Sequence, residues 1–151
     1  MQLSFMYMLT PVGQLKLVAN ETALVAVLWQ NENPKRVRLE ELLEQHDHPI
    51  LCEAQQQLAE YFAGTRQQFD LPLDFDGTYF QKQVWQALLQ IPYGETRSYK
   101  QIAEQLGNPK AVRAVGAASG KNPISIIAPC HRVIGASGKL VGFAGGLDNK
   151  Q

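Results

Sequence analysis

Three reactive side chains follow one another in the run Pro129-Cys130-His131-Arg132. A free cysteine thiol has a pKa of about 8.5 and is mostly protonated at neutral pH, but a neighbouring imidazole or cation favours the thiolate. The run therefore predicts a nucleophilic cysteine. The alternative is that Cys130 is a small buried residue and His131 a hydrogen-bonded core residue, which is the commoner situation for an arbitrary Cys-His pair.

The apolar stretch 124–128 stands directly before this run. Its composition predicts a short buried strand that ends at Pro129. Because proline breaks a strand, the residues after it are expected to lie on a sharp turn that presents Cys130.

Helices are expected on the N-terminal side of the cysteine. Thr78 is predicted to cap one helix that closes at 91–94, and Ser98 to cap a second over 99–106. The run 107–109 breaks the chain, and a third helix is predicted from Lys110 to about Ser119. Two short helices joined by a turn that contains glycine are typical of a helix-turn-helix.

The third predicted helix is rich in alanine and almost lacks the Asn, Gln and Arg side chains that read base edges. Small residues favour close approach to a minor groove, and the long side chain of Arg113 could enter the base stack in place of an extruded nucleotide. Tyr99 could press on a phosphate or on the displaced base. The alternatives are a buried packing helix, a solvent-facing arginine and a core tyrosine.

The first half of the chain predicts a small α/β unit. Three runs with strand-like patterns, within 3–9, 15–19 and 23–29, predict an antiparallel meander, and apolar residues at helical spacing predict a helix from Pro49 that Gly64 ends. The stretch 65–77 is the expected linker. We therefore predict two domains, 1–76 and 77–151.

Charge is distributed unevenly between these halves. Residues 1–76 carry 5 Lys+Arg against 11 Asp+Glu, and residues 77–151 carry 9 against 3. This asymmetry predicts an anionic partner for the second half, with nucleic acid as the leading candidate, unless the two halves attract each other.

Two separated cysteines and three histidines predict neither a disulfide framework nor a metal site. The absence of a leader or a long apolar run predicts a cytoplasmic protein.

The block 80–146 closely resembles the O6-alkylguanine-DNA alkyltransferases of the bacterial constitutive type. The matching stretches are 80–85, 91–96, Tyr99 with Ile102-Ala103, 108–116, Asn122-Pro123, 129–134 and 142–146. Residues 1–76 resemble, in their order of elements, the ribonuclease-H-like cap of that family. The resemblance implies a ribonuclease-H-like α/β domain followed by a mainly α-helical, winged-helix-like domain with a helix-turn-helix.

The resemblance also assigns roles to single residues. It implies that Cys130 accepts the alkyl group, that His131 is a general base acting through water, and that Tyr99 helps to rotate and protonate the base. Arg113 resembles the arginine that fills the gap in the stack, and Asn122 the residue that braces the hinge before the cysteine. Further DNA contacts are expected at Ala111, Gly116, Ser119 and Arg132, and pocket walls at Val133, Phe143, Ala144 and Gly145.

The implied activity is DNA repair by a suicide transferase that uses no cofactor. It would act as a monomer on double-stranded DNA that contains O6-alkylguanine, independently of sequence. Family members carry a final helix whose Glu orients the histidine, and its expected place lies about six residues past Gln151 on the family's spacing. Reduced reactivity is therefore expected, and a lesion-recognition module with weak or no transfer is the alternative. A Cys-His hydrolase is a third hypothesis, which leaves the helix-turn-helix unexplained.

Overall fold

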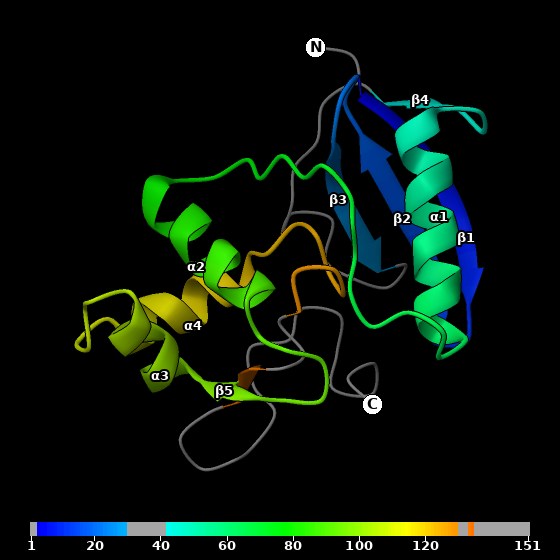
Figure 1. The fold of residues 1–151 in the computed structure, drawn as a ribbon. Coiled ribbons are helices and arrows are strands. Elements are labelled where there is room, and N and C mark those ends of the chain that lie inside the picture. Colours follow the sequence, from blue (N-terminus) through cyan, green and yellow to red (C-terminus); the bar gives the residue numbers. More distant parts are fainter. Residues whose placement is uncertain (1–2, 30–41, 130–132, 135–151) are drawn as a thin grey trace. The chain divides into compact units, whose positions relative to one another are not determined.

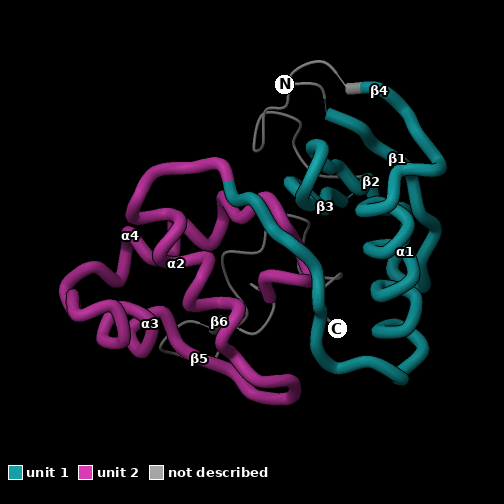
Figure 2. Tube along the Cα trace, turned by 45° about the horizontal axis from the view of Figure 1, so that its top comes forward, with its two compact units in different colours: residues 1–75 teal, residues 76–151 magenta. Residues whose placement is uncertain are grey.

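The computed structural model describes residues 3–29, 42–129 and 133–134 (Figure 1). The chain forms two compact units, Met1–Phe75 and Asp76–Gln151 (Figure 2). Among the described residues, no helix has the length and apolar character needed to cross a membrane.

A four-stranded sheet forms the base of the first unit. It consists of β1 (Leu3–Thr10), β2 (Gly13–Ala19), β3 (Leu24–Trp29) and β4 (Leu42–Glu44), in the order β3-β2-β1-β4. The predicted antiparallel meander is confirmed by the pairing of β1 with β2 and of β2 with β3. Strand β4, which lies parallel to β1, was not predicted, because three residues are too few to show a periodic pattern.

One helix, α1 (Pro49–Phe62), covers a face of this sheet (Figure 1). It begins with Pro49 at its first position, where a backbone N–H would have no partner within the helix. The Nδ1 atom of His48 accepts a hydrogen bond from the backbone N–H of Ile50 at 3.1 Å. Gly64, with φ +81°, follows its end. The side chains of α1 that are fully buried in the core are Leu51, Ala54 and Leu58, which recur at helical spacing.

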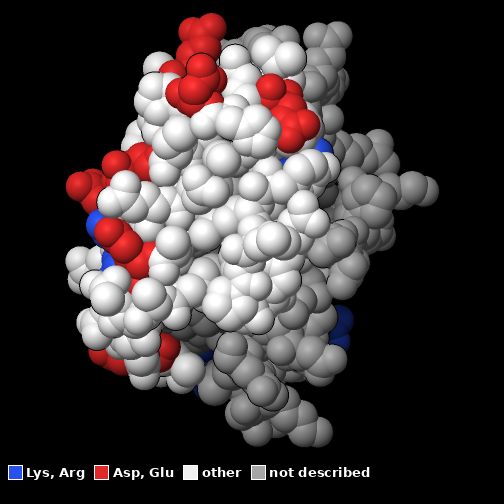
Figure 3. All heavy atoms as spheres, turned by 90° about the vertical axis from the view of Figure 1, so that its right-hand side faces the viewer, with Lys and Arg blue, Asp and Glu red and all other residues white. Residues whose placement is uncertain are grey.

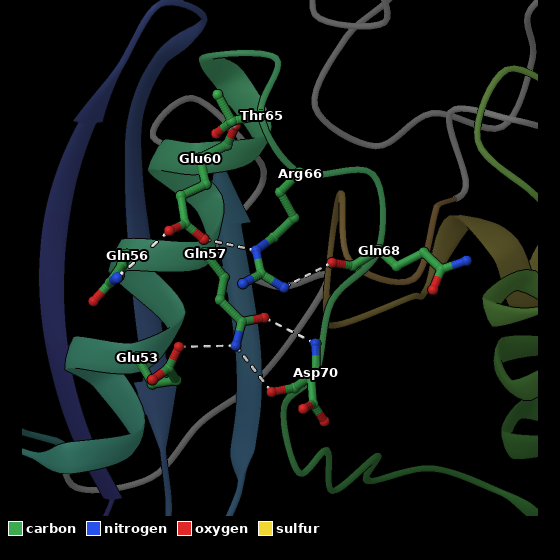
Figure 4. A network of polar contacts seen from close by, with 8 residues as sticks. All are labelled: Glu53, Gln56, Gln57, Glu60, Thr65, Arg66, Gln68 and Asp70. Atoms are coloured by element: carbon green, nitrogen blue, oxygen red, sulfur yellow. Dashed lines mark hydrogen bonds and ion pairs between the residues drawn. The ribbon is translucent and has the colours of Figure 1, made fainter.

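The segment that follows α1 is tied to the first unit rather than free. The buried amide of Gln57 accepts from the Asp70 backbone N–H at 2.8 Å and donates to the Asp70 carbonyl at 2.9 Å (Figure 4). Further along, Leu24 pairs in parallel with Leu73 as a single bridge. The prediction of a linker over 65–77 is therefore wrong up to Phe75, because these backbone groups find partners on α1 and β3.

An ion pair strengthens the start of this segment. Nε of Arg66 lies 2.7 Å from the Glu60 carboxylate, and the same guanidinium donates to the carbonyl of Gln68 at 3.0 Å (Figure 4). The hydrogen bond from Arg66 lowers the pKa of Glu60 below its usual value. Since a carboxyl group with a lowered pKa stabilises the fold only while it is ionised, this contribution is present at neutral pH and is lost as the pH falls through the lowered pKa.

The second unit is mainly helical. Its elements are α2 (Tyr79–Leu89), β5 (Arg97–Ser98), α3 (Tyr99–Gln105), α4 (Val112–Gly120) and β6 (Val133–Ile134). Both predicted caps are confirmed, since Thr78 and Ser98 each form a complete capping box, with Gln81 and Gln101 respectively. The fully buried residues Val84, Leu88, Ile102, Val115 and Ile124 belong to its core.

The turn between α3 and α4 has the geometry that a helix-turn-helix requires. Gly107 takes φ +78° after α3, its N–H donates to the carbonyl of Glu104, and the N–H of Asn108 donates to that of Ala103. These two bonds form a Schellman motif, which glycine favours. Helix α4 begins at Val112, two residues later than predicted, because the Ala111 N–H turns back to the carbonyl of Asn108.

The Gln57 contact generates a prediction. Gln57→Ala removes both hydrogen bonds to Asp70 and is expected to lower the free energy of unfolding by about 2 kcal/mol, measured by urea denaturation. Trypsin should also cut faster after Arg66. Gln56→Ala is the matched control, because this exposed glutamine is next to Gln57 on the same helix, and it should change stability by less than about 0.5 kcal/mol. Equal losses in the two variants would contradict the role given to Gln57.

Candidate active site

The structure describes half of the predicted site. Tyr99, Ala111, Arg113, Gly116, Ser119 and Asn122 all lie in described parts of the second unit. For Val133 only its place in β6 is described. Cys130, His131, Arg132, Phe143, Ala144 and Gly145 lie outside the described residues, so their predicted roles rest on the sequence.

Helix α4 presents small side chains and one arginine to solvent. Arg113, Ala114 and Ala117 are exposed, whereas Val115 and Ala118 are buried against the unit. Ala111 is half-buried at the position before the helix and provides no side-chain cap. A helix surface of this kind can lie close to a nucleic-acid backbone, with one long side chain projecting from it.

Tyr99 lies on α4 at Gly116. A Cβ atom built on Gly116 would be 3.4 Å from Cε2 of the tyrosine ring and 3.5 Å from Cδ2. The glycine therefore lets the ring rest directly on the helix backbone. This contact brings Tyr99, at the first position of α3, next to the helix that carries Arg113.

The side chain of Ser119 is buried. It is 2% exposed, on the inward side of α4 one residue after the buried Ala118, and within the described structure its Oγ has no hydrogen-bond partner. The DNA contact predicted at Ser119 stays a prediction, and in this conformation it would fall to the backbone and not to the hydroxyl.

The amide of Asn122 spans the turn that follows α4. Its Oδ1 accepts from the backbone N–H of Ile124 at 3.0 Å, and its Nδ2 donates to the carbonyl of Ala128 at 2.7 Å. The side chain is 1% exposed, so water does not compete for these bonds. One residue thus connects the end of α4 to a point two residues before Cys130.

The stretch 124–128 is a compact turn, so the prediction of a strand there is wrong. The Ala128 N–H donates to the carbonyl of Ile124 at 3.0 Å, and the Ile127 N–H to that of Ser125 at 2.8 Å. Between them Ile126 takes φ +72°, which makes this a classic γ-turn, a rare and strained conformation for a β-branched residue. Tertiary contacts prevail over the β propensity of isoleucine, because all five side chains are buried and Asn122 fixes both ends.

Strand β6 brings the chain after the cysteine back to α3. Arg97 of β5 pairs in parallel with Val133, and Ser98 pairs with Ile134. Tyr99 follows Ser98 directly. The backbone that begins three residues after Cys130 therefore lies beside the strand that leads into Tyr99.

The described cations of the second unit are largely free to meet an anion. Arg97 is paired with Glu95 at 3.1 Å, whereas no ion pair involves the remaining cations in residues 76–129. These exposed side chains are Lys82, Lys100, Lys110, Arg113 and Lys121. By contrast, Asp and Glu outnumber Lys and Arg on the side of the molecule where α1 and β1 are drawn (Figure 3).

A shallow hollow of about 400 Å³ lies between α2 and the end of α3. It is lined by Tyr79, Lys82, Gln83, Gln86, Ala87, Gln90, Gln105 and Leu106. None of the predicted site residues is among them. In the described residues no group of three or more His, Cys, Asp or Glu side chains is placed to hold a metal ion.

Two features near the site were not predicted. The indole N–H of Trp85 donates to the carbonyl of Ala118 at 2.8 Å, and Ile126 has its positive φ. Trp85 lies in the stretch 80–85, which resembles the alkyltransferase family, but neither helical spacing nor composition indicated its hydrogen-bond partner 33 positions away. No sequence signal marked Ile126, because glycine and asparagine are the residues that usually announce a positive φ.

Two family models match the chain. A 6-O-methylguanine DNA methyltransferase ribonuclease-like domain matches residues 3–75, and a 6-O-methylguanine DNA methyltransferase DNA-binding domain matches residues 79–151. The pairing of a ribonuclease-like domain with a helical DNA-binding domain, which the sequence predicted, is thereby confirmed.

Relatives and solved structures agree with these models. The methylated-DNA–protein-cysteine methyltransferase of Mycolicibacterium paratuberculosis is 50% identical over 144 residues, which cover 94% of this chain and 84% of the relative. The protein of the same name from Methanosarcina acetivorans is 49% identical, over 94% of this chain and 90% of its own length. A crystal structure of Mycobacterium tuberculosis OGT in complex with DNA matches with a TM-score of 0.88 at 45% identity, over 99% of this chain and 88% of that one.

Most substitutions of core residues lower the free energy of unfolding, but removal of the buried hydroxyl of Ser119 is expected to raise it. Ser119→Ala removes an unpaired buried polar group and favours the helix, so the free energy of unfolding should rise by about 1–2 kcal/mol in urea denaturation. Ser98→Ala is the control, since it deletes the same atom from a working cap and should destabilise the protein by about 1 kcal/mol. Loss of stability in Ser119→Ala would show that the hydroxyl has a partner.

Proposed function

The chain belongs to the 6-O-methylguanine DNA methyltransferase family, and from this we propose that it repairs DNA by moving the alkyl group of O6-alkylguanine to its own Cys130. The observation that carries the proposal is the joint match of both family domains, 3–75 and 79–151, to a chain that holds the run Pro129-Cys130-His131-Arg132. The Asn122 turn supports it, because a braced backbone leads directly into that run.

In the proposed reaction the Cys130 thiolate attacks the alkyl carbon. A sulfur–carbon bond forms, the bond from that carbon to O6 breaks, and its electron pair stays with the guanine, which takes up one proton. His131 would accept the thiol proton through water, and Tyr99 would supply a proton or hydrogen bond to the leaving base. The product is a thioether, which is not reduced as a disulfide is, so each molecule would act once and without a cofactor.

DNA is the proposed partner, and it would be bound without regard to sequence. The exposed face of α4 carries alanines and lacks the amide side chains that read base edges, whereas the exposed lysines and Arg113 within residues 76–129 suit phosphates. Arg113 would enter the stack when the damaged base leaves it, and Tyr99, resting on Gly116, would meet the displaced nucleotide. Backbone contacts to DNA are proposed near Ala111, Gly116 and Ser119.

The remaining assignments are inferred from the family. We propose that Arg132 contacts DNA, that the pocket for the base is walled by Val133, Phe143, Ala144 and Gly145, and that Asn122 braces the hinge. The specificity for O6-alkylguanine, action as a monomer and a place in the cytoplasm are proposals of the same kind.

The acceptor role of Cys130 predicts a mass change. After incubation with duplex DNA that contains O6-methylguanine, the peptide with Cys130 should gain one methyl group per protein molecule, as measured by mass spectrometry of a digest. Cys130→Ser should abolish the gain and still bind the DNA. Cys52→Ser is the matched control, because it removes the exposed cysteine of α1 and should leave the gain intact. Binding without any mass gain would instead favour a recognition module, and neither binding nor gain would contradict the proposal.

If Arg113 fills the gap in the base stack, its loss should slow alkyl transfer from duplex DNA more than from single-stranded DNA. Arg113→Ala should slow transfer from duplex DNA by about ten- to a hundredfold, because the gap in the stack is left open, and should affect single-stranded substrate much less. Lys121→Ala removes the same charge from the end of α4 and should weaken binding to both substrates alike. Equal slowing of Arg113→Ala on both substrates, measured in single-turnover reactions, would contradict this role.

A further inference from the structure

The indole of Trp85 is a fixed contact between α2 and the last turn of α4. The ring is 2% exposed, and its N–H donates to the carbonyl of Ala118 at 2.8 Å. The same carbonyl accepts the N–H of Lys121, the residue after α4, at 3.0 Å. Because a carbonyl has two lone pairs, it can hold both donors at once, and the indole bond is therefore an addition to the ordinary end of the helix.

The opposite edge of the ring is also confined. A Cβ atom built on Gly77 would lie 2.6 Å from Cη2 and 2.7 Å from Cζ3 of Trp85, closer than side chains approach. The backbone at Gly77 thus packs against the six-membered ring while the nitrogen side binds Ala118. The buried ring is thus packed at one edge and hydrogen-bonded at the other, which suits it to hold the carbonyl of Ala118 in place.

From Ala118 the backbone of the last turn of α4 and the hydrogen bonds of Asn122 lead toward Cys130. The Asn122 N–H donates to the carbonyl of Ser119 at 3.3 Å, next to the carbonyl that Trp85 holds. The Asn122 side chain then binds Ile124 and Ala128. Only Pro129 separates Ala128 from the cysteine, so a shift of the last turn of α4 would be passed on to the base of the reactive run.

The DNA-facing part of α4 is separate from this contact. Arg113, Ala114 and Ala117 are exposed, whereas Ala118 is buried on the side that Trp85 contacts. Removing the indole N–H changes none of the exposed side chains. Such a change is therefore expected to affect where the helix end directs the chain more than how strongly the helix binds DNA.

We propose that Trp85 is a positioning residue for alkyl transfer, which fixes the last turn of α4 and through Asn122 sets where Cys130 is presented to the flipped base. The inference rests on the proposed function, since it assumes that Cys130 is the acceptor. It goes further by assigning a task to a residue that contacts neither DNA nor the reacting atoms. A tryptophan that merely fills the core would support stability alone, and its N–H would make no difference to the reaction.

The test uses an isostere that lacks only the donor. Trp85→β-(3-benzothienyl)alanine keeps the shape of the ring and replaces its N–H by sulfur, and Trp85→Phe is the simpler companion variant. Trp29→Phe, a buried tryptophan of β3 in the first unit, is the matched control. The rate constant of methyl transfer is measured in single turnover at saturating duplex DNA with O6-methylguanine. The dissociation constant for the same DNA is measured on proteins that combine each tryptophan substitution with Cys130→Ser, so that no transfer occurs during the binding measurement.

We expect the benzothienyl variant to transfer about three- to tenfold more slowly, which corresponds to the usual net effect of one hydrogen bond, with a dissociation constant within about twofold of the parent. Trp29→Phe should leave both quantities unchanged. An unchanged rate in the benzothienyl variant would overturn the proposal, as would a parallel loss of rate and DNA affinity. If the unmodified protein transfers no methyl group, the proposed function itself fails and this inference falls with it, which distinguishes the two cases.

Discussion

The second unit depends on one buried amide. The side chain of Asn122 makes two hydrogen bonds that close the turn after α4, and no regular element replaces them between Lys121 and Pro129. A helix end and five apolar residues are thereby held in one conformation, although one of these residues carries an unfavourable φ. The energy of that strained residue is tolerated because burial and the amide contacts together fix the surrounding backbone.

The first unit uses the same chemical device for a different segment. Gln57 offers its amide to the backbone of Asp70 as a neighbouring strand would, with one donor and one acceptor. In both units, therefore, the side-chain amide of Asn or Gln makes the hydrogen bonds that a neighbouring strand would otherwise make, at a point where the chain leaves regular secondary structure. Asn and Gln suit this task because each carries both hydrogen-bonding functions and no charge that burial would penalise.

Much of the fold could be predicted from the sequence, because local rules govern it. Thr78 and Ser98 cap their helices as expected, Gly64 and Gly107 follow helix ends, and the meander of three strands was visible in its alternation. An error arose where a side chain and not the backbone pattern decides the outcome. The composition of the apolar run 124–128 predicts a strand, yet the run folds into a turn because Asn122 binds both of its ends.

For the candidate site the sequence supplied the reactive residues but not their supports. Cys130 and His131 were found from adjacent residue types, a local signal, and they lie outside the described residues. The contact of Trp85 with Ala118 spans 33 positions, and no spacing rule covers it. Likewise β4 is too short to be seen in a pattern, and it forms because β1 offers an unpaired edge.

The resting place of the Tyr99 ring on Gly116 has a consequence for how this sequence can change. An alanine at position 116 would place its Cβ atom about 3.4 Å from the ring edge, which is an ordinary van der Waals contact. A bulkier side chain, with further atoms beyond Cβ, would compete with the ring at position 99 for the same space. Positions 99 and 116 should therefore covary among descendants of this chain, seventeen residues apart in sequence and adjacent in space.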